Sequence, residues 1–189
     1  MSMYKLVKST FIQEYKTRPE PYKQRLVEWS AQAPVVNAGK PTNIARAREL
    51  GYKAKEGIFI ARVRVKGGSK KRQAPSGGRK PHTSGRFFTR AKSLQAIAEG
   101  RAAARFSNCE VLNSYFVGSA GSSKFFEVIM LDRSSPTLAH DPKYGSIIAS
   151  RNRALRGLTH VGRKHRGISK KGFGYIQFRP SRRQQIRGR

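Results

Sequence analysis

The clearest hydrophobic pattern in the chain is an alternation over residues 57–66, GIFIARVRVK. One face of this segment, if extended, carries only apolar side chains, those of Phe59, Ala61, Val63 and Val65. The opposite face starts apolar and then turns basic, with Ile58, Ile60, Arg62 and Arg64. Because successive side chains of a strand point to opposite faces, the pattern predicts a β-strand with one face apolar throughout.

A helix and then a hairpin are predicted downstream of that strand. Residues 93–106, SLQAIAEGRAAARF, place apolar side chains on one helical stripe, with Ser93 as the N-cap. Residues 109–118 and 124–132 are rich in β-branched and aromatic side chains, and SAGSS joins them. This predicts two antiparallel strands with a loop longer than the tight two-residue type. Together these elements predict the α+β class: a small, mostly antiparallel sheet with packed helices.

Three short helices are predicted in the first fifty residues. The first covers residues 4–16, and RPEP then breaks its pattern. The second lies near residues 22–32 and carries the sole tryptophan, Trp29. An aromatic residue at helical spacing packs in a protein core more often than it stacks on a base, so Trp29 is expected in the core. The third starts with Thr42 as N-cap and stops at Gly51.

Composition and charge point to an anionic partner. The 189 residues contain 40 Lys and Arg against 10 Asp and Glu, a formal net charge of +30. Self-repulsion of that size opposes compaction unless a counter-charge is present. A single cysteine excludes an internal disulfide, and no apolar run approaches the roughly 18 residues of a membrane span. We therefore expect a soluble intracellular protein without a secretory signal, and without a metal or cofactor.

The positive charge is concentrated in two acid-free blocks. Gly57–Ala98 holds eleven Lys and Arg, and Pro142–Arg189 holds fourteen. Solvated protein surfaces usually mix both signs, so such blocks favour contact with a polyanion. We expect a single domain with three parts: a basic helical segment over residues 1–56, a core over 57–132 with a basic loop at 67–92, and a basic tail over 133–189.

Glycine spacing in the tail is regular but fits neither helix nor strand. In RGLTHVGRKHRGISKKGFG, residues 156–174, glycine recurs every fifth position, at Gly157, Gly162, Gly167 and Gly172. Nothing in the chain is expected to order this stretch, so we expect a backbone that approaches another surface closely, with cations between the glycines. The loop at 67–92 has a similar composition. Both are predicted to be long basic extensions that become ordered on one partner.

Nucleic acid fits these extensions better than a membrane or an acidic protein. Neither block forms an amphipathic helix with a large apolar face. Aromatic side chains that could stack on unpaired bases are interspersed with the cations: Phe87, Phe88, Phe173, Tyr175 and Phe178. No helix-turn-helix or zinc-finger pattern is present, and the crevices of folded RNA suit two long arms better than a DNA duplex does. A general architectural DNA binder remains an alternative.

An enzyme, such as a basic nuclease, is the other alternative. His160 and His165 could form an acid/base pair, but they lie in a glycine-rich tail that predicts no rigid support for catalysis. Asp132 and Asp141 are not closely spaced, so metal-assisted hydrolysis has few ligands to draw on. Cys109 has no Cys or His cluster around it and is predicted to be a small core residue.

Four segments resemble a known family. They are MSMYKLVK at the start, RARELGYKAKEGIFIARVRVKGGSKKR at 46–72, VLNSYFVG at 111–118, and RGLTHVGRKHRGISKKGFG. In this order they resemble the archaeal and eukaryotic "e" family of large-subunit ribosomal protein fifteen, and the short loop after Lys71 looks archaeal. The resemblance covers essentially the whole chain. It implies a structural protein of the cytoplasmic ribosome, with arms between ribosomal RNA helices, neighbouring ribosomal proteins as further partners, and no catalytic role.

A subset of the cations and histidines in the two acid-free blocks is predicted to bind RNA. In the first block they are Arg62, Arg64, Lys66, Lys70, Lys71, Arg72, Arg79, Lys80, Arg86, Arg90 and Lys92. In the second they are Arg156, His160, Arg163, Lys164, His165, Arg166, Lys170, Lys171, Arg179, Arg182 and Arg183. They are expected to neutralise phosphates, and the four regularly spaced glycines to let the backbone come close to the RNA.

Overall fold

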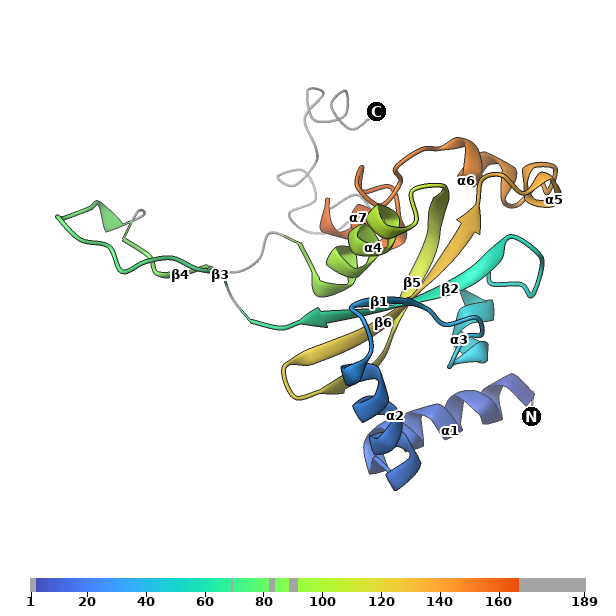
Figure 1. Cartoon of the computed structure of the whole chain (residues 1–189), viewed down its shortest axis with the longest axis horizontal. Coiled ribbons are helices and arrows are strands. Elements are labelled where there is room, and N and C mark those ends of the chain that lie inside the picture. Colours follow the sequence, from blue (N-terminus) through green and yellow to red (C-terminus); the bar gives the residue numbers. More distant parts are fainter. Residues whose placement is uncertain (1–2, 69, 82–83, 89–91, 167–189) are drawn as a thin grey trace, which may run out of the picture.

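An antiparallel sheet of four strands, in the order β1-β2-β6-β5, forms the centre of the molecule (Figure 1). The structure is a computed structural model that describes residues 3–68, 70–81, 84–88 and 92–166. The strands of this sheet are β1 Val35–Asn37, β2 Ile58–Lys66, β5 Cys109–Ala120 and β6 Ser123–Asp132. The helices are α1 Met3–Thr17, α2 Glu20–Ala31, α3 Ile44–Glu49, α4 Leu94–Arg105, α5 Pro136–Ala139, α6 Gly145–Ala149 and α7 His160–His165. The predicted α+β class is confirmed.

Helix α4 covers one face of the sheet. Its Ala98 and Ala102 are fully buried against the apolar face that the alternation in β2 predicts. The buried side chains of this layer are Ala61, Val63, Val65, Ala98, Ala102, Val111, Phe126, Val128 and Met130. Phe59 joins them at the margin, with its ring edge-on to Phe106 at a centroid distance of 5.2 Å. Small alanines in α4 let the helix lie close to the strands, which makes this face a continuous core.

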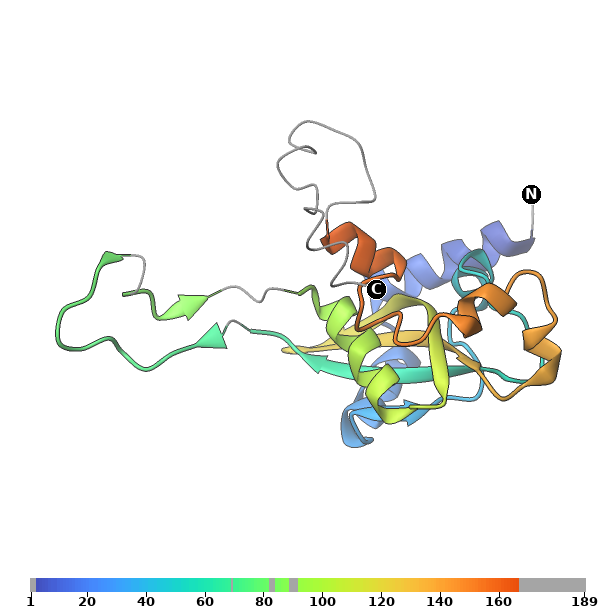
Figure 2. The ribbon, with the colours of Figure 1, turned by 90° about the horizontal axis from the view of Figure 1, so that it is seen from above.

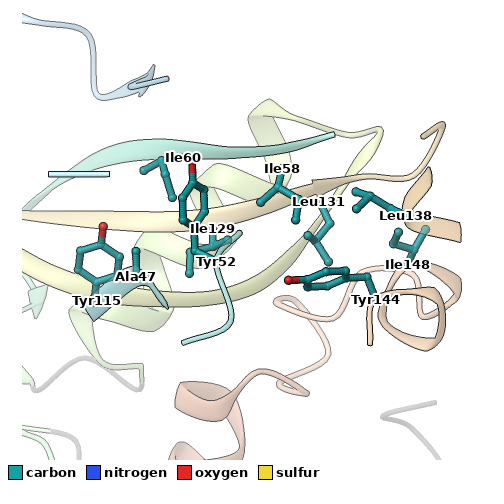
Figure 3. Packing of buried hydrophobic residues seen from close by; sticks show 10 residues of the cluster. All are labelled: Ala47, Tyr52, Ile58, Ile60, Tyr115, Ile129, Leu131, Leu138, Tyr144 and Ile148. Atoms are coloured by element: carbon teal, nitrogen blue, oxygen red, sulfur yellow. The ribbon is translucent and has the colours of Figure 1, made fainter. Parts of the chain in front are cut away.

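The opposite face is covered by several short helices. Figure 3 shows the larger cluster, in which β2, β5 and β6 meet α3, α5 and α6 through Ala47, Tyr52, Ile58, Ile60, Tyr115, Ile129, Leu131, Leu138, Tyr144 and Ile148. Farther along the same face, α2 packs on Phe125 through Tyr22, Leu26 and Trp29. The sequence assigns residues from 133 onward to the basic tail, but Leu138, Tyr144 and Ile148 are buried. The packed body therefore extends at least as far as α6.

A buried carboxylate joins the two clusters on this face. Glu127 on β6 is fully buried and pairs in register with Arg62 on β2 and Tyr115 on β5. The Tyr115 hydroxyl donates to it, and so do the N–H and hydroxyl of Thr42, at 3.0 and 2.5 Å. The Arg62 guanidinium lies 3.6 Å away. Burial and the adjacent Glu127 charge raise the pKa of Tyr115, so its hydroxyl stays a donor.

The helix ends follow the predicted capping chemistry with one exception. Ser93 caps α4 by accepting from the N–H of Ala96 at 3.2 Å, as predicted. Gly51 follows α3 with a φ of +98°, a left-handed conformation that suits glycine. The prediction of Thr42 as N-cap of α3 is wrong. Asn43 is the cap and accepts from the N–H of Arg46 at 2.9 Å, because both polar groups of Thr42 bind Glu127 instead.

The hairpin between β5 and β6 turns more tightly than the sequence indicates. Ala120 pairs with Ser123, so only Gly121 and Ser122 form the turn, and Gly121 has a φ of +51°. The prediction of a longer loop is wrong because the small residues of SAGSS continue the strands. A glycine at positive φ is what a two-residue turn between twisted strands requires.

The basic loop projects away from the sheet (Figures 1 and 2). The sequence predicts that this loop becomes ordered only on a partner. In its described part, however, β3 Lys70–Lys71 pairs with β4 Phe87–Phe88, and the N–H of Arg72 donates to the carbonyl of Arg86 at 3.0 Å. The two limbs of the loop therefore run side by side as a narrow ribbon.

Candidate nucleic-acid interface

The stretch before and including α7 is ordered by contacts within the chain. Thr159 is fully buried and caps α7 by accepting from the N–H of Gly162 at 3.1 Å. The same Thr159 hydroxyl donates to Glu99 of α4 at 2.6 Å. The expectation that nothing in the chain would hold this segment is therefore wrong for residues 156–166. The anchor is a carboxylate sixty positions upstream.

Two of the four regularly spaced glycines, Gly157 and Gly162, lie against each other. A Cβ placed on Gly162 would lie 2.6 Å from the Cα of Gly157 and 2.7 Å from its carbonyl carbon. Gly157 itself has a φ of +67° and lies against the side chain of Arg166. Glycine at these positions lets the turn before α7 touch the helix. Gly167 and Gly172 lie outside the described residues.

Two buried glutamates bind this C-terminal part to the core. Glu110 of β5 accepts from the backbone N–H groups of Asn152 and Arg153 at 2.8 and 3.2 Å. Glu99 accepts from the hydroxyls of Thr159 and Ser114, at 2.6 and 2.5 Å. Burial raises the pKa of Glu99 above its usual value, although both hydroxyl contacts oppose the shift. These carboxylates fix α7 beside α4 and β5.

A cleft of about 660 Å³ opens between α3, the start of α4, β5 and α7, and we call it the α3–α7 cleft. Its lining residues are Arg46, Leu50, Ser93, Gln95, Asn113, Ser114, His160, Val161, Lys164 and His165. The cleft brings three predicted residues together: His160, Lys164 and His165. Sequence reasoning missed Arg46, Gln95 and Asn113, because they lie on other elements and reach the cleft only through the tertiary fold.

Two further hollows continue this surface on either side. A hollow of about 130 Å³ shares His165 with the cleft and adds the predicted side chains of Lys92, Arg156 and Arg166. Another hollow, of about 750 Å³, adjoins the cleft on the other side. Its lining residues Gly51 and Leu112 are the chain neighbours of Leu50 and Asn113, which line the cleft. The cations that line it were all missed: Arg48, Lys53, Lys55 and Lys143.

We call the three hollows together the basic face. Among the residues that the structure describes, no acidic side chain lines any of them. Two of the cations are paired at the margin, Arg46 with Glu49 at 2.6 Å and Lys55 with Asp141 at 2.9 Å. Hydrogen bonds from the backbone N–H of Lys143 and from the Lys55 ammonium hold the pKa of Asp141 below its usual range, so that carboxyl stays charged. The basic face therefore has the concave shape and excess of cations that polyanion binding needs.

Two of the predicted RNA-binding arginines are used inside the fold. Arg62 lies over the Trp29 ring, 4.3 Å from its centroid, and its side chain is only 15% exposed. Arg64 donates to the backbone carbonyl of Ser30. The face of β2 that turns basic is covered by α2, so these cations bind the helix to the sheet.

The remaining predicted cations fall into three groups: exposed residues, residues of the strand β3, and residues outside the described part of the chain. Exposed in the described part of the chain are Lys66, Arg72, Arg79, Lys80, Arg86, Lys92 and Arg163. Lys70 and Lys71 form β3 in the projecting loop (Figure 2). Outside the described residues are Arg90, Lys170, Lys171, Arg179, Arg182 and Arg183. The described part of the loop between Lys70 and Phe88 therefore projects away from the sheet, whereas Lys92 at the end of the loop lines the basic face.

Neither a membrane span nor a metal cluster is found in the described residues. Among the helices of that part of the chain, none is long and apolar enough to cross a membrane. The same residues contain no group of three His, Cys, Asp or Glu side chains that could hold a metal ion. Cys109 is half-buried at the edge of the α4 layer, and burial raises the pKa of its thiol to about 11.

Comparison with known proteins agrees with the resemblance found in the four sequence segments. The family model described as ribosomal L15, the L15e model, matches residues 2–185. A large ribosomal subunit protein eL15 from Metallosphaera sedula is 43% identical over 191 residues, which cover 98% of this chain and 88% of the relative. The protein of the same name from Methanocorpusculum labreanum is 45% identical over 159 residues, covering 84% of this chain and 82% of the relative. The chain therefore belongs to the L15e family of ribosomal proteins.

Proposed function

We propose that the chain binds folded ribosomal RNA of the large subunit through the basic face and the projecting loop. Its family is one of structural ribosomal proteins and not of enzymes, which gives it a structural role in the cytoplasmic ribosome. The observation that carries the proposal is the basic face itself. In the described part of the chain, three adjoining hollows are lined by cations from α3, α7 and the segments beside them, and by no acid.

The binding is electrostatic in origin and specific through shape. Each phosphate that a Lys or Arg neutralises releases condensed counterions, so contact with about ten phosphates gives a slope of log affinity against log salt near −7 to −9. The concave surface selects RNA whose backbone follows the same curve. The projecting loop and the C-terminal residues reach between RNA helices, and neighbouring ribosomal proteins complete the contacts.

The two alternatives predict different substrates. A nuclease would need a general acid and base held near a phosphate, and the α3–α7 cleft does contain His160 and His165. Among the described residues, no carboxylate lines the cleft to position these two histidines. An architectural DNA binder would bind random duplex DNA as tightly as ribosomal RNA, whereas a shape-selective RNA binder would not.

The test compares the full chain with two double variants of equal charge. Lys53→Ala with Lys164→Ala removes two cations of the basic face, and Lys16→Ala with Lys23→Ala removes two exposed cations from α1 and α2. A tagged copy of each is sedimented from cell extract at about 0.5 M salt, which removes loose cation-driven binding. We expect the first variant to be depleted from the large subunit and the second to remain. Equal behaviour of both variants, or migration of the unaltered chain at the top of the gradient, would contradict the proposal.

A further inference from the structure

We infer that the α3–α7 cleft holds one unpaired nucleotide of RNA, with its base inserted into the cleft. This inference rests on the proposed function and names the feature of the RNA that the site recognises. A volume of about 660 Å³ lies within the roughly 300–1,000 Å³ of ordinary small-molecule sites. A paired base faces the interior of its helix, so only a base turned out of the stack can enter.

The walls of the cleft offer flat and apolar surfaces for a base. Leu50 and Val161 contribute aliphatic side chains from the ends of α3 and α7. His160 and His165 contribute imidazole rings, and Arg46 contributes a planar guanidinium. Aromatic rings and guanidinium planes are the surfaces on which unstacked RNA bases lie in proteins.

Two amides with fixed orientation supply hydrogen-bonding groups in the same cleft. Gln95 donates its amide N–H to the carbonyl and hydroxyl oxygens of Ser114, both at 2.9 Å, which leaves its own carbonyl oxygen as an acceptor. Asn113 accepts from the backbone N–H of Ser114 at 3.1 Å, which leaves its NH₂ group as a donor. The contacts with Ser114 thus decide which way each amide points. Every base has neighbouring donors and acceptors on its Watson–Crick edge, so this pair recognises a base without selecting one.

The local fold makes this arrangement rigid. A β-bulge interrupts the pairing of β5 between Val111 and Asn113, and bulges redirect the side chains beside them. Below the cleft, buried Glu99 accepts from Ser114 at 2.5 Å and from Thr159 at 2.6 Å. One carboxylate therefore supports both the amide wall and the α7 wall. Side chains fixed before binding lose little entropy when the ligand arrives.

The cations of the cleft suit the phosphates that flank such a nucleotide. Lys164 lines the cleft and is exposed, so a phosphate beside the inserted base can reach it. A base inside the cleft and phosphates at the rim divide the recognition into two parts that can be measured separately. Removing the base changes the first part only, and removing a rim cation changes the second.

The experiment uses the full-length protein and an RNA hairpin with a single-nucleotide bulge. A matched hairpin carries an abasic residue at the bulge, so the two RNAs have the same phosphates and differ only in the base. Dissociation constants are measured by fluorescence anisotropy at about 0.3 M salt, where loose electrostatic binding is weak. We expect the base-bearing hairpin to bind about tenfold more tightly, which is within the effect of stacking one base.

Three variants separate the two parts. Asn113→Ala, and Asn113→Asp with the acceptor for Ser114 retained, are expected to lower the ratio of the two dissociation constants, because both remove the amide donor to the base. Lys164→Ala is expected to weaken both hairpins by a similar factor and to leave the ratio unchanged. Because the readout is a ratio, a loss of stability in a variant does not imitate the result.

The outcomes distinguish this inference from the proposed function. A ratio near one for the unaltered protein, with both hairpins weakened by Lys164→Ala, would overturn the nucleotide site and leave the RNA-binding proposal standing. Failure of the unaltered protein to bind either hairpin more tightly than a DNA duplex of equal charge would overturn both. A tenfold ratio that survives both Asn113 variants would also count against the site as described.

Discussion

Gly162→Ala is the change that tests most directly how α7 is held. The added methyl would lie 2.6 and 2.7 Å from the Cα and carbonyl carbon of Gly157, whereas ordinary carbon contacts begin near 3.4 Å. The atoms it meets belong to backbone, so no side chain can rotate away. Helix α7 and the turn at Gly157 must therefore separate by close to 1 Å.

The magnitude follows from two opposing effects. Alanine in a helix is favoured over glycine by about 1 kcal/mol because glycine loses more backbone entropy on folding. Overpacking in a well-packed site costs about 1–3 kcal/mol, and the contact here is with backbone on both sides. We expect a net loss of about 1–2 kcal/mol in the docking of α7, without unfolding of the sheet, because the three atoms nearest to the added methyl all belong to Gly157.

Gly100→Ala is a matched control, because the same methyl is added inside another helix of the same chain. The nearest heavy atom to that methyl, a carbon of Leu155, would be 3.8 Å away, an ordinary contact. This variant should gain about 1 kcal/mol from helix propensity. The assay is hydrogen exchange resolved by mass spectrometry. Gly162→Ala should speed exchange in residues 159–166 by about tenfold while α4 and the sheet keep their protection. Equal protection of α7 in both variants would refute the packing argument.

Three other predictions concern buried ionisable groups. Glu127→Gln leaves the guanidinium of Arg62 without its counter-charge, so urea unfolding should show a loss of about 3 kcal/mol, whereas Glu20→Gln at an exposed pair should leave the midpoint unchanged. Burial raises the pKa of Glu99 above 4.5, so the folded protein holds the proton of Glu99 more tightly than the unfolded chain does. The stability that this proton contributes is complete below pH 4.5 and is lost as the pH rises through the folded-state pKa. Urea midpoints from pH 4 to 8 should therefore fall more for the unaltered protein than for Glu99→Gln, and parallel curves would contradict this. The pKa of Cys109 is raised to about 11, so iodoacetamide at pH 8 should alkylate it about 100-fold more slowly than the urea-unfolded chain, and equal rates would show that the thiol is not shielded.

The fold was largely predictable because its main signals are local. The alternation in β2, the stripe of α4 and the capping serine each follow from a few neighbouring residues, and all are confirmed. The cap of α3 was missed because a contact between distant parts of the chain determines it. Thr42 and Asn43 are both good caps by composition, and the choice between them is made by Glu127, which is 85 positions away from Thr42 in sequence.

The candidate site was less predictable because the position of a cation in the sequence does not show where its side chain lies in the fold. Arg62 and Arg64 occur in an acid-free block, yet they bind α2 to the sheet. Arg46 lies outside both blocks and still lines the cleft beside Lys164. The glycine period of the tail was interpreted as a close approach to RNA, whereas the structure shows Gly157 and Gly162 packed against each other. Only the tertiary fold shows which cations meet.

The acids of this protein explain how a chain of net charge +30 keeps a folded core. Eight of its ten acids accept hydrogen bonds or ion pairs from the chain itself: Glu14, Glu20, Glu49, Glu99, Glu110, Glu127, Asp132 and Asp141. Three of them are buried and join segments that are distant in sequence. Of the eight acids, Glu49 and Asp141 pair with cations of the basic face, so most of the cations that line this face keep an unbalanced positive charge. In the free protein the cations of the basic face repel one another. On the proposed function, RNA phosphates supply the counter-charge that the protein lacks there.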